Sequence, residues 1–217
     1  MSTINLSWSN YTTKDIILYL EKIKIKENIQ YIHLEGNFLL IKDFHFLFHK
    51  TLPSFIFIHH LNLSRTNISS HHISIFSENI SFLPNLRSIN LSYNFLNSKS
   101  IRLLKPVLPQ LEELSLSSNF ISNYGIYHLI SQFHKMTRLK KLYLAHCFLK
   151  SRDILSLSSS IGSLTNLEYF SIQGNKCNTF SFCYLLESIP SHNLIYLNCV
   201  FSNDSKELIL CQVLLIE

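Results

Sequence analysis

The sequence predicts an α/β fold: a right-handed solenoid with a parallel sheet on its concave face and helices on its convex face. One observation is a change of hydrophobic rhythm within the stretch LEELSLSSNFISNYGIYHLISQF. Leu114 and Leu116 alternate as in a strand with one buried face, while Leu129 and Phe133, four residues apart, share one helix face. A second observation is that this stretch recurs along the chain at nearly constant intervals.

Each copy has apolar residues at positions 1, 4, 6 and 11 and a small polar residue at position 9. One copy cannot bury both its strand stripe and its helix stripe, so neighbouring copies must stack. Strands pair about 4.8 Å apart whereas packed helices need about 8–10 Å, so the stack bends with the sheet inside. We expect residues 1–217 to form a single domain of about 7–8 repeats, which start near 1, 29, 58, 86, 111, 139, 167 and 194.

Position 9 lies where the chain turns out of each strand. A side-chain amide there can bond loop backbone groups that would otherwise be buried unpaired, at a cost of about 1–3 kcal/mol each. The alternative, a row of amides that contacts a ligand, is disfavoured because inward-pointing turn residues are normally structural. The residues at this position are Asn37, Thr66, Asn94, Asn119, Cys147 and Asn175.

One copy is shorter than the others. It begins at Leu86, ends before the next start at Leu111, and contains Pro106 and Pro109. Proline at these places predicts a crossover helix that ends after about Leu104.

The C-terminal segment SKELILCQVLLIE is rich in apolar residues. We expect Ser205 to Leu215 to form a final helix that packs on the last strand near Leu197. Its surplus apolar surface would be left for further repeats, a missing cap or self-association with a second copy of the chain. The alternative is a helix that only caps the core.

The pattern resembles the leucine-rich repeat family, LxxLxLxxN/CxL, in the matches IQYIHLEGNFL, LRSINLSYNFL, LEELSLSSNFI and LKKLYLAHCFL. The nearly constant period with a helical second half is similar to the ribonuclease-inhibitor-like subclass. The resemblance covers essentially the whole chain. It implies a horseshoe segment with a strand and a helix in each repeat, and a binding scaffold as the function.

Composition and charge exclude several classes of protein. With 47% hydrophobic and 15% charged residues, the chain can bury a sizeable core. The net charge of +5 is spread thinly and no nucleic-acid motif is present, so we expect no nucleic-acid partner. We also expect no membrane partner, because the sequence has neither a signal peptide nor an apolar window of about 18 residues. The 5 cysteines form no CxxC pair, which predicts reduced thiols in the cytoplasm or the nucleus.

Positions 3, 5, 7 and 8 of each copy look away from the core and make up the predicted concave surface. Tyrosine and arginine are enriched at interface hot spots, so two groups of residues are candidates for partner binding. The first, in the N-terminal half, is Tyr31, His33, His60, Arg65 and Tyr93. The second, which we favour, is Lys141, Tyr143, His146, Tyr169, Tyr196 and Phe201. The alternative is that these rings simply cover an exposed sheet.

The sequence gives little support for a catalytic, metal or cofactor site. His33, His59 and His60 fall on adjacent strands and His71 and His72 in a crossover, but they complete no recognised metal-ligand pattern. No GxSxG, glycine-rich phosphate loop or acid–base carboxylate pair is present. We therefore predict no catalytic residue, no metal and no cofactor.

The predicted function is a non-enzymatic scaffold that binds a protein partner of unknown identity through its concave sheet. One alternative is a small-GTPase regulator, because the same subclass resembles the activator of the Ran GTPase; an assay of GTP hydrolysis distinguishes it. A second alternative is a substrate-recognition subunit of a ubiquitin ligase.

Overall fold

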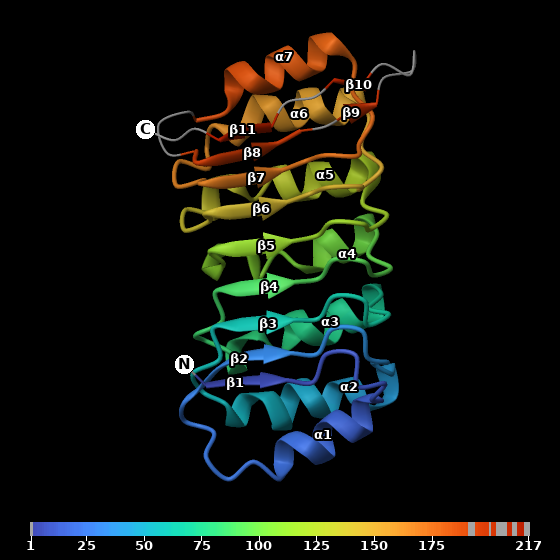
Figure 1. Cartoon of the computed structure of the whole chain (residues 1–217), viewed down its shortest axis with the longest axis vertical. Helices are drawn as coiled ribbons and strands as arrows, with labels where there is room; N and C mark the ends of the chain where they lie inside the picture. Colours follow the sequence, from blue (N-terminus) through green and yellow to red (C-terminus); the bar gives the residue numbers. More distant parts are fainter. Residues whose placement is uncertain (1, 191–193, 200, 203–207, 210–211, 215–217) are drawn as a thin grey trace.

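Strands and helices alternate along the chain in the computed structural model, which describes residues 2–190, 194–199, 201–202, 208–209 and 212–214. Within this part of the chain, nine strands form one sheet in the order β1-β2-β3-β4-β5-β6-β7-β8-β11, and the first eight run parallel (Figure 1). This arrangement confirms the predicted α/β solenoid. The parallel strands are β1 Ser2–Asn5, β2 Ile29–His33, β3 His60–Asn62, β4 Ser88–Asn90, β5 Glu113–Ser115, β6 Lys141–Tyr143, β7 Tyr169–Ser171 and β8 Tyr196–Asn198.

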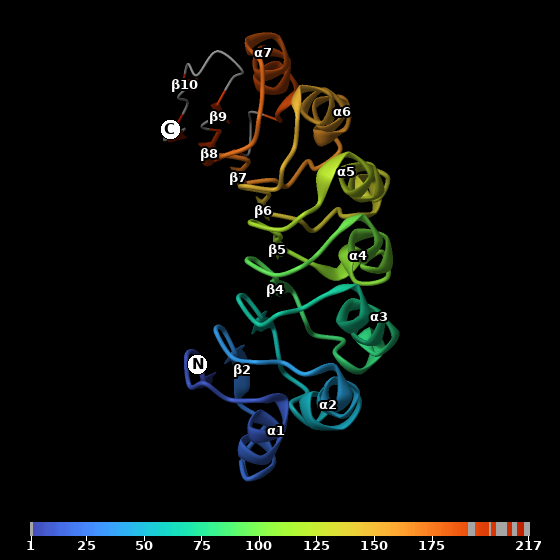
Figure 2. The same cartoon turned by 90° about the vertical axis from the view of Figure 1, so that its right-hand side faces the viewer.

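The helices lie on the outer side of a curved stack and the strands on the inner side (Figure 2). The curvature follows from the wider spacing that packed helices need. Among the described residues, no helix is both long and apolar enough to cross a membrane. The α-helices are α1 Thr13–Glu21, α2 Ile41–Phe46, α3 Ser70–Glu78, α4 Ser98–Leu103, α5 Ser122–Ile130, α6 Ser151–Ile161 and α7 Thr179–Ser188. Shorter turns are the π-helix η1 Leu47–Thr51 and the 3-10 helices η2 Leu52–Ser54, η3 Ile80–Phe82, η4 Leu108–Gln110 and η5 Phe133–Lys135.

The core runs between the sheet and the helices as one continuous apolar cluster. Leu114 and Leu116 of one strand segment are fully buried, as is Leu129 of the following helix. Stacking of adjacent repeats therefore removes both stripes from water, which is the main source of stabilisation in a fold without a central globular core.

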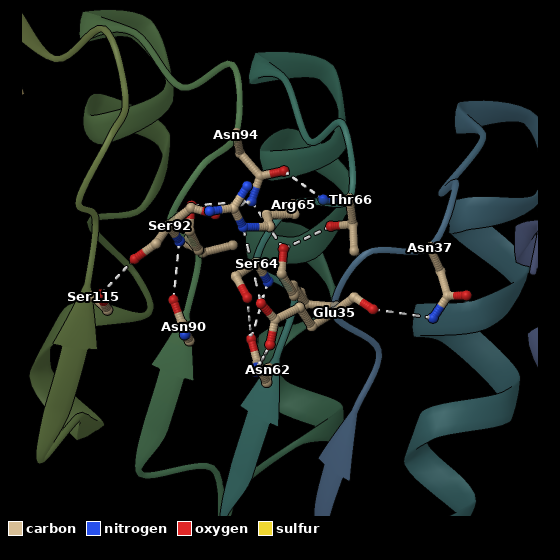
Figure 3. Close-up of polar contacts among 12 residues, drawn as sticks. Glu35, Asn37, Asn62, Ser64, Arg65, Thr66, Asn90, Ser92, Asn94 and Ser115 are labelled. Carbon is tan, nitrogen blue, oxygen red and sulfur yellow. Dashed lines mark hydrogen bonds and ion pairs between the residues drawn. The ribbon is translucent and has the colours of Figure 1, made fainter. Parts of the chain in front are cut away.

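The expected backbone role of position 9 is confirmed. Asn94 Oδ1 accepts from the Thr66 N–H at 3.0 Å (Figure 3). It also accepts from the Ile68 N–H (2.9 Å), and its Nδ2 donates to the carbonyls of Leu63 (2.8 Å) and Leu91 (3.0 Å). Each amide thus joins its own turn to the preceding one. Asn37, Asn119 and Asn175 make corresponding bonds, while the shorter Thr66 and Cys147 side chains donate to a carbonyl.

The proline-containing segment also follows its prediction. Helix α4 ends at Leu103, with Leu104 as its C-terminal cap, and η4 with Pro109 replaces the remaining turns. The physical reason is that proline lacks an N–H and restricts the preceding residue.

The predicted C-terminal helix is wrong for the residues that the structure describes. Leu208–Ile209 forms β10, which pairs antiparallel with β9 Phe201–Ser202, and Gln212–Leu214 forms β11. Strand β11 pairs antiparallel with β8, with Val213 opposite Leu197. The segment does return to the last repeat strand, but by satisfying its open backbone edge rather than by helix packing. The rest of the predicted helix lies outside the described residues.

Candidate functional site

The inner face of the sheet carries a row of position-3 side chains in strict register. The Cα pairing runs from Tyr31 to His60, Ser88, Glu113, Lys141, Tyr169 and Tyr196, one residue from each neighbouring strand. Every residue of this row is half-buried, so its side chain touches its neighbours and still presents surface. Because parallel pairing fixes the spacing, the row is a rigid polar and aromatic stripe along the solenoid.

The favoured C-terminal group converges at one end of this row. Lys141 Nζ lies 4.0 Å from a Glu113 carboxylate oxygen and 5.2 Å from the centroid of the Tyr169 ring. The Tyr169 and Tyr196 ring centroids are 6.1 Å apart. Burial, followed by the charge of Glu113 and the two neighbouring tyrosines, raises the pKa of Tyr143 to about 12. The phenol therefore stays protonated and can donate a hydrogen bond to a partner at physiological pH.

His146 lies apart from this cluster, and the side chain of Phe201 is not described. His146 sits in the loop after β6, where a Cβ on Gly174 would overlap its imidazole ring, so the ring covers the backbone of the next repeat. Phe201 belongs to β9, and its side chain lies outside the described residues. The structure therefore brings together four of the six residues: Lys141, Tyr143, Tyr169 and Tyr196.

The N-terminal group divides into two clusters. In the first, the His60 ring lies 5.9 Å from the Tyr31 ring and 5.2 Å from the His33 ring, and His60 Nδ1 is 2.7 Å from Ser88 Oγ. Burial, with smaller effects from the charges of His33 and Lys141, lowers the pKa of His60 to about 4. His60 is therefore neutral near pH 7 and can both donate and accept.

The second N-terminal cluster centres on Arg65, at the loop edge of the sheet. Its guanidinium lies 3.8 Å from the Tyr93 ring centroid and 6.0 Å from that of Trp8, and its Nε is 4.0 Å from Glu35 (Figure 3). A guanidinium stacked on an aromatic ring with a carboxylate beside it is held in place at little entropic cost. The sequence indicated Arg65 and Tyr93 but not the part played by Glu35.

Position 8 has a backbone feature that sequence reasoning missed. The φ angle is positive at this position, with values of 58° at Trp8, 56° at Arg65, 55° at Tyr93 and 53° at His146. Gly36 and Gly174, at the same position of two other copies, both have a φ of 71°. A bulky residue in the left-handed region costs about 1–3 kcal/mol. Glycine in two copies was the available signal. The chain thus places large aromatic and cationic side chains where the backbone favours glycine.

Position 7 corrects the predicted surface in part. Ser64 and Ser92 are buried, and their hydroxyls bond to Asn62 Oδ1 (2.8 Å) and Ser115 Oγ (2.6 Å) within the sheet (Figure 3). These serines stiffen the strand ends and do not belong to the contact surface.

A further exposed feature, also missed, is phenylalanine at position 10. The side chains of Phe95, Phe120 and Phe148 are 58%, 55% and 63% exposed, and Phe38 occupies the same place in the second copy. The recurring NFL, NFI and CFL triplets were the sequence signal.

Nothing in the described part of the chain assembles a metal or nucleophile site. Within it, no three His, Cys, Asp or Glu side chains gather in a way that could hold a metal ion. His72 is buried and its Nε2 is 3.2 Å from the Leu39 carbonyl oxygen, a structural contact between repeats. Burial raises the pKa of the Cys147 thiol to about 12, the opposite of what an activated thiolate requires.

Comparison with known proteins supports the fold. No family model matches the chain. Among solved structures, the chain is similar to internalin C2 from Listeria monocytogenes, with 18% identity, a TM-score of 0.49, and coverage of 80% of this chain and 62% of that one. It thus spans less than two thirds of the length of internalin C2. It is also similar to actin-binding site 2 of leiomodin-1, with 13% identity, a TM-score of 0.55, and coverage of 71% and 89%. At 13% identity the likeness to the leiomodin-1 segment is one of fold alone.

Proposed function

We propose that the chain is a non-enzymatic interaction module that binds a folded protein partner through its concave sheet. The observation that carries this proposal is the position-3 row, in which half-buried Tyr, His, Lys and Glu side chains stand in register on a rigid parallel sheet. Such a surface loses little side-chain entropy on binding, because its rings and charges already support one another. Lys141, Tyr143, Tyr169 and Tyr196 are the proposed contact centre.

The repeats are best interpreted as leucine-rich repeats of the ribonuclease-inhibitor-like subclass. A helix follows every parallel strand from β1 to β7, and Asn or Cys at position 9 joins adjacent turns. We further infer a reducing compartment, the cytoplasm or the nucleus, because the free thiols of Cys147 and Cys177 are part of the buried core.

The test is a comparison of two double variants in quantitative affinity capture. Tyr143→Ala/Tyr169→Ala removes two concave rings, whereas Tyr19→Ala/Tyr184→Ala removes two exposed rings from the helices α1 and α7. We expect proteins that wild type and the helix variant both capture to be lost from the concave variant. Calorimetry with the purified partner should show a loss of at least about 2 kcal/mol, or roughly thirtyfold.

The controls separate binding from folding. Neither tyrosine pair is fully buried, so both variants should melt within a few degrees of wild type. A partner that binds both double variants as tightly as wild type would contradict the concave site. Stimulation of GTP hydrolysis by a small GTPase would instead favour the regulatory alternative.

A further inference from the structure

The exposed rings of Phe95, Phe120 and Phe148, called here the Phe edge, are held rigidly at one side of the solenoid. The N–H of Phe95 donates to the Ile68 carbonyl and that of Phe120 to the Leu96 carbonyl, both at 2.9 Å. These bonds tie Phe95 and Phe120 to the preceding repeat. The Phe120 and Phe148 rings stack with centroids 5.2 Å apart and an angle of 14° between their planes.

Two hollows flank the Phe148 ring, each with a volume of about 340 Å³. One is lined by Ser122, Phe148, Lys150, Arg152 and Asp153. The other is lined by His146, Phe148, Lys150, Gly174, Asn175 and Lys176. Phe148 and Lys150 form the ridge between them, so an apolar ring and a cation are presented together.

Asp153 is an unsatisfied acceptor in the first hollow. Asp153 is only 2% exposed, and its Oδ2 accepts from the Lys150 N–H at 2.9 Å in the capping box of α6. Within the part of the chain that the structure describes, its Oδ1 has no hydrogen-bond partner. A buried carboxylate oxygen without a donor is costly, so a small shift of the Asp153 side chain that lets this oxygen accept from an N–H or O–H group of a ligand in the hollow would be stabilising.

The rim of the two hollows beside Phe148 is basic. Residues 79–186 contain 11 Lys and Arg and 4 Asp and Glu, and two of these cations, Lys140 and Lys141, pair with Glu112 and Glu113 at the strand starts. Of these acids, Asp153 is buried, and Glu112, Glu113 and Glu168 lie at the starts of β5 and β7, the opposite ends of the strands from the Phe edge. The exposed charges next to the rings are therefore the cations of Lys150, Arg152 and Lys176.

We propose that the Phe edge, with the two hollows beside Phe148, binds an acidic peptide segment that carries apolar side chains. The apolar side chains pack against the Phe edge and enter the hollows, the carboxylates pair with Lys150, Arg152 and Lys176, and a peptide N–H donates to Asp153 Oδ1. This surface differs from the concave sheet, and its ligand is a flexible acidic segment rather than a folded face.

The geometry favours a peptide over a single-stranded nucleic acid. Bases stack on aromatic faces that are free, whereas Phe120 and Phe148 stack on each other and so share their inner faces. The Asp153 carboxylate would repel a phosphate entering the first hollow but would accept a peptide N–H. An anionic peptide satisfies both the cationic rim and this acceptor.

The test begins with selection from a phage-displayed library of random linear peptides. Panning on wild type is followed by counter-selection against Phe120→Ala/Phe148→Ala, a variant that should fold normally because both rings are exposed. We expect surviving peptides to combine Asp or Glu with Leu, Ile, Phe or Trp. A synthetic fluorescein-labelled copy of the strongest peptide is then titrated by fluorescence polarisation.

Charge and aromatic contributions are separated by matched variants. Affinity should fall at least about tenfold in Lys150→Gln/Lys176→Gln and in Phe120→Ala/Phe148→Ala, and should weaken as salt rises. The controls Lys22→Gln/Lys24→Gln and Phe57→Ala/Phe82→Ala remove exposed side chains elsewhere and should bind as wild type does.

Unchanged affinity in Tyr143→Ala/Tyr169→Ala would show that the Phe edge acts independently of the concave sheet, whereas a loss there would overturn the separate site. Selected peptides without acidic residues, or with equal affinity for every variant, would also overturn the proposal. Tighter binding of a labelled oligo(dT) strand, lost in the same variants, would reassign the Phe edge to single-stranded nucleic acid.

Discussion

Replacing Asn119 by alanine should destabilise the fold more than any loss of an exposed amide. Asn119 is fully buried; its Nδ2 donates to the carbonyls of Leu91 and Leu116, both at 2.9 Å, and its Oδ1 accepts from the Leu96 N–H at 3.0 Å. Alanine would leave the buried Leu96 N–H unpaired, at a cost of about 1–3 kcal/mol, and would remove one of the two bonds to each of the Leu91 and Leu116 carbonyls, which keep those from Asn94 Nδ2 and Cys147 Sγ. We therefore expect the free energy of unfolding to fall by at least about 2 kcal/mol, a large part of the roughly 5–15 kcal/mol typical of a domain.

The assay is urea unfolding followed by circular dichroism, with Asn166→Ala as the matched control. Asn166 is exposed and donates one inter-repeat bond to the Thr137 carbonyl at 2.7 Å, so its loss should cost less than about 1 kcal/mol. The shift in midpoint multiplied by the common slope gives the difference in stability. Equal midpoints for the two variants would refute the view that position-9 amides hold the stack together.

Cys147→Asn should raise the free energy of unfolding by about 1–2 kcal/mol in the same urea assay. The new amide oxygen would accept backbone N–H groups, as the Asn175 oxygen accepts those of Cys147 and Leu149. A lower midpoint than wild type would contradict this. Wild type should lose more stability than His60→Gln as pH falls from about 6.5 to 4. The folded-state pKa of His60 is lowered to about 4, so the unfolded chain binds the proton first; the effect is at most about 3 kcal/mol and is reduced by partial exposure. Parallel stability curves for the two proteins over that range would show that His60 does not titrate in this way. Ser118→Gly should stabilise by about 0.5–1 kcal/mol, because Ser118 has a φ of 57° in a place that holds glycine in two other repeats; a calorimetric melting temperature below that of wild type would refute the strain.

The sequence predicted the solenoid because its signals are local and repeated. Alternation at Leu114 and Leu116 predicted a strand, and the spacing of Leu129 and Phe133 predicted a helix. The helix is present, but α5 ends at Ile130 and Phe133 begins the separate 3-10 helix η5, so the predicted shared face is wrong. A wrong interpretation of one copy would conflict with the others. The amide at position 9 follows from the same logic, because a buried turn must have its backbone groups paired. The register between strands follows from the repeat alone, because copies of similar length place the same positions side by side.

The side-chain arrangement could be predicted only in part, because it depends on contacts between repeats. His146 turns onto Gly174, the residue at the same position of the next repeat, and the partnership of Arg65 with Glu35 and Tyr93 spans three repeats. The C-terminal prediction was wrong for a different reason. Apolar content alone does not distinguish a capping helix from strands, and the open backbone edge of β8 favoured pairing.

The same position-9 amides that build the stack also separate its two proposed surfaces. Positions 9 and 11 are buried, so positions 8 and 10 must project outward whatever residues occupy them, and neither is needed to fill the core. Asn67 and Lys176 occupy position 10 in other copies, and Lys176 keeps the corresponding backbone bond to the preceding repeat, from its N–H to the Leu149 carbonyl at 2.9 Å. The fold therefore tolerates polar residues at the place of Phe95, Phe120 and Phe148. Leaving three such rings in water gains nothing for stability, which is why a binding role for the Phe edge accounts for them better than packing does.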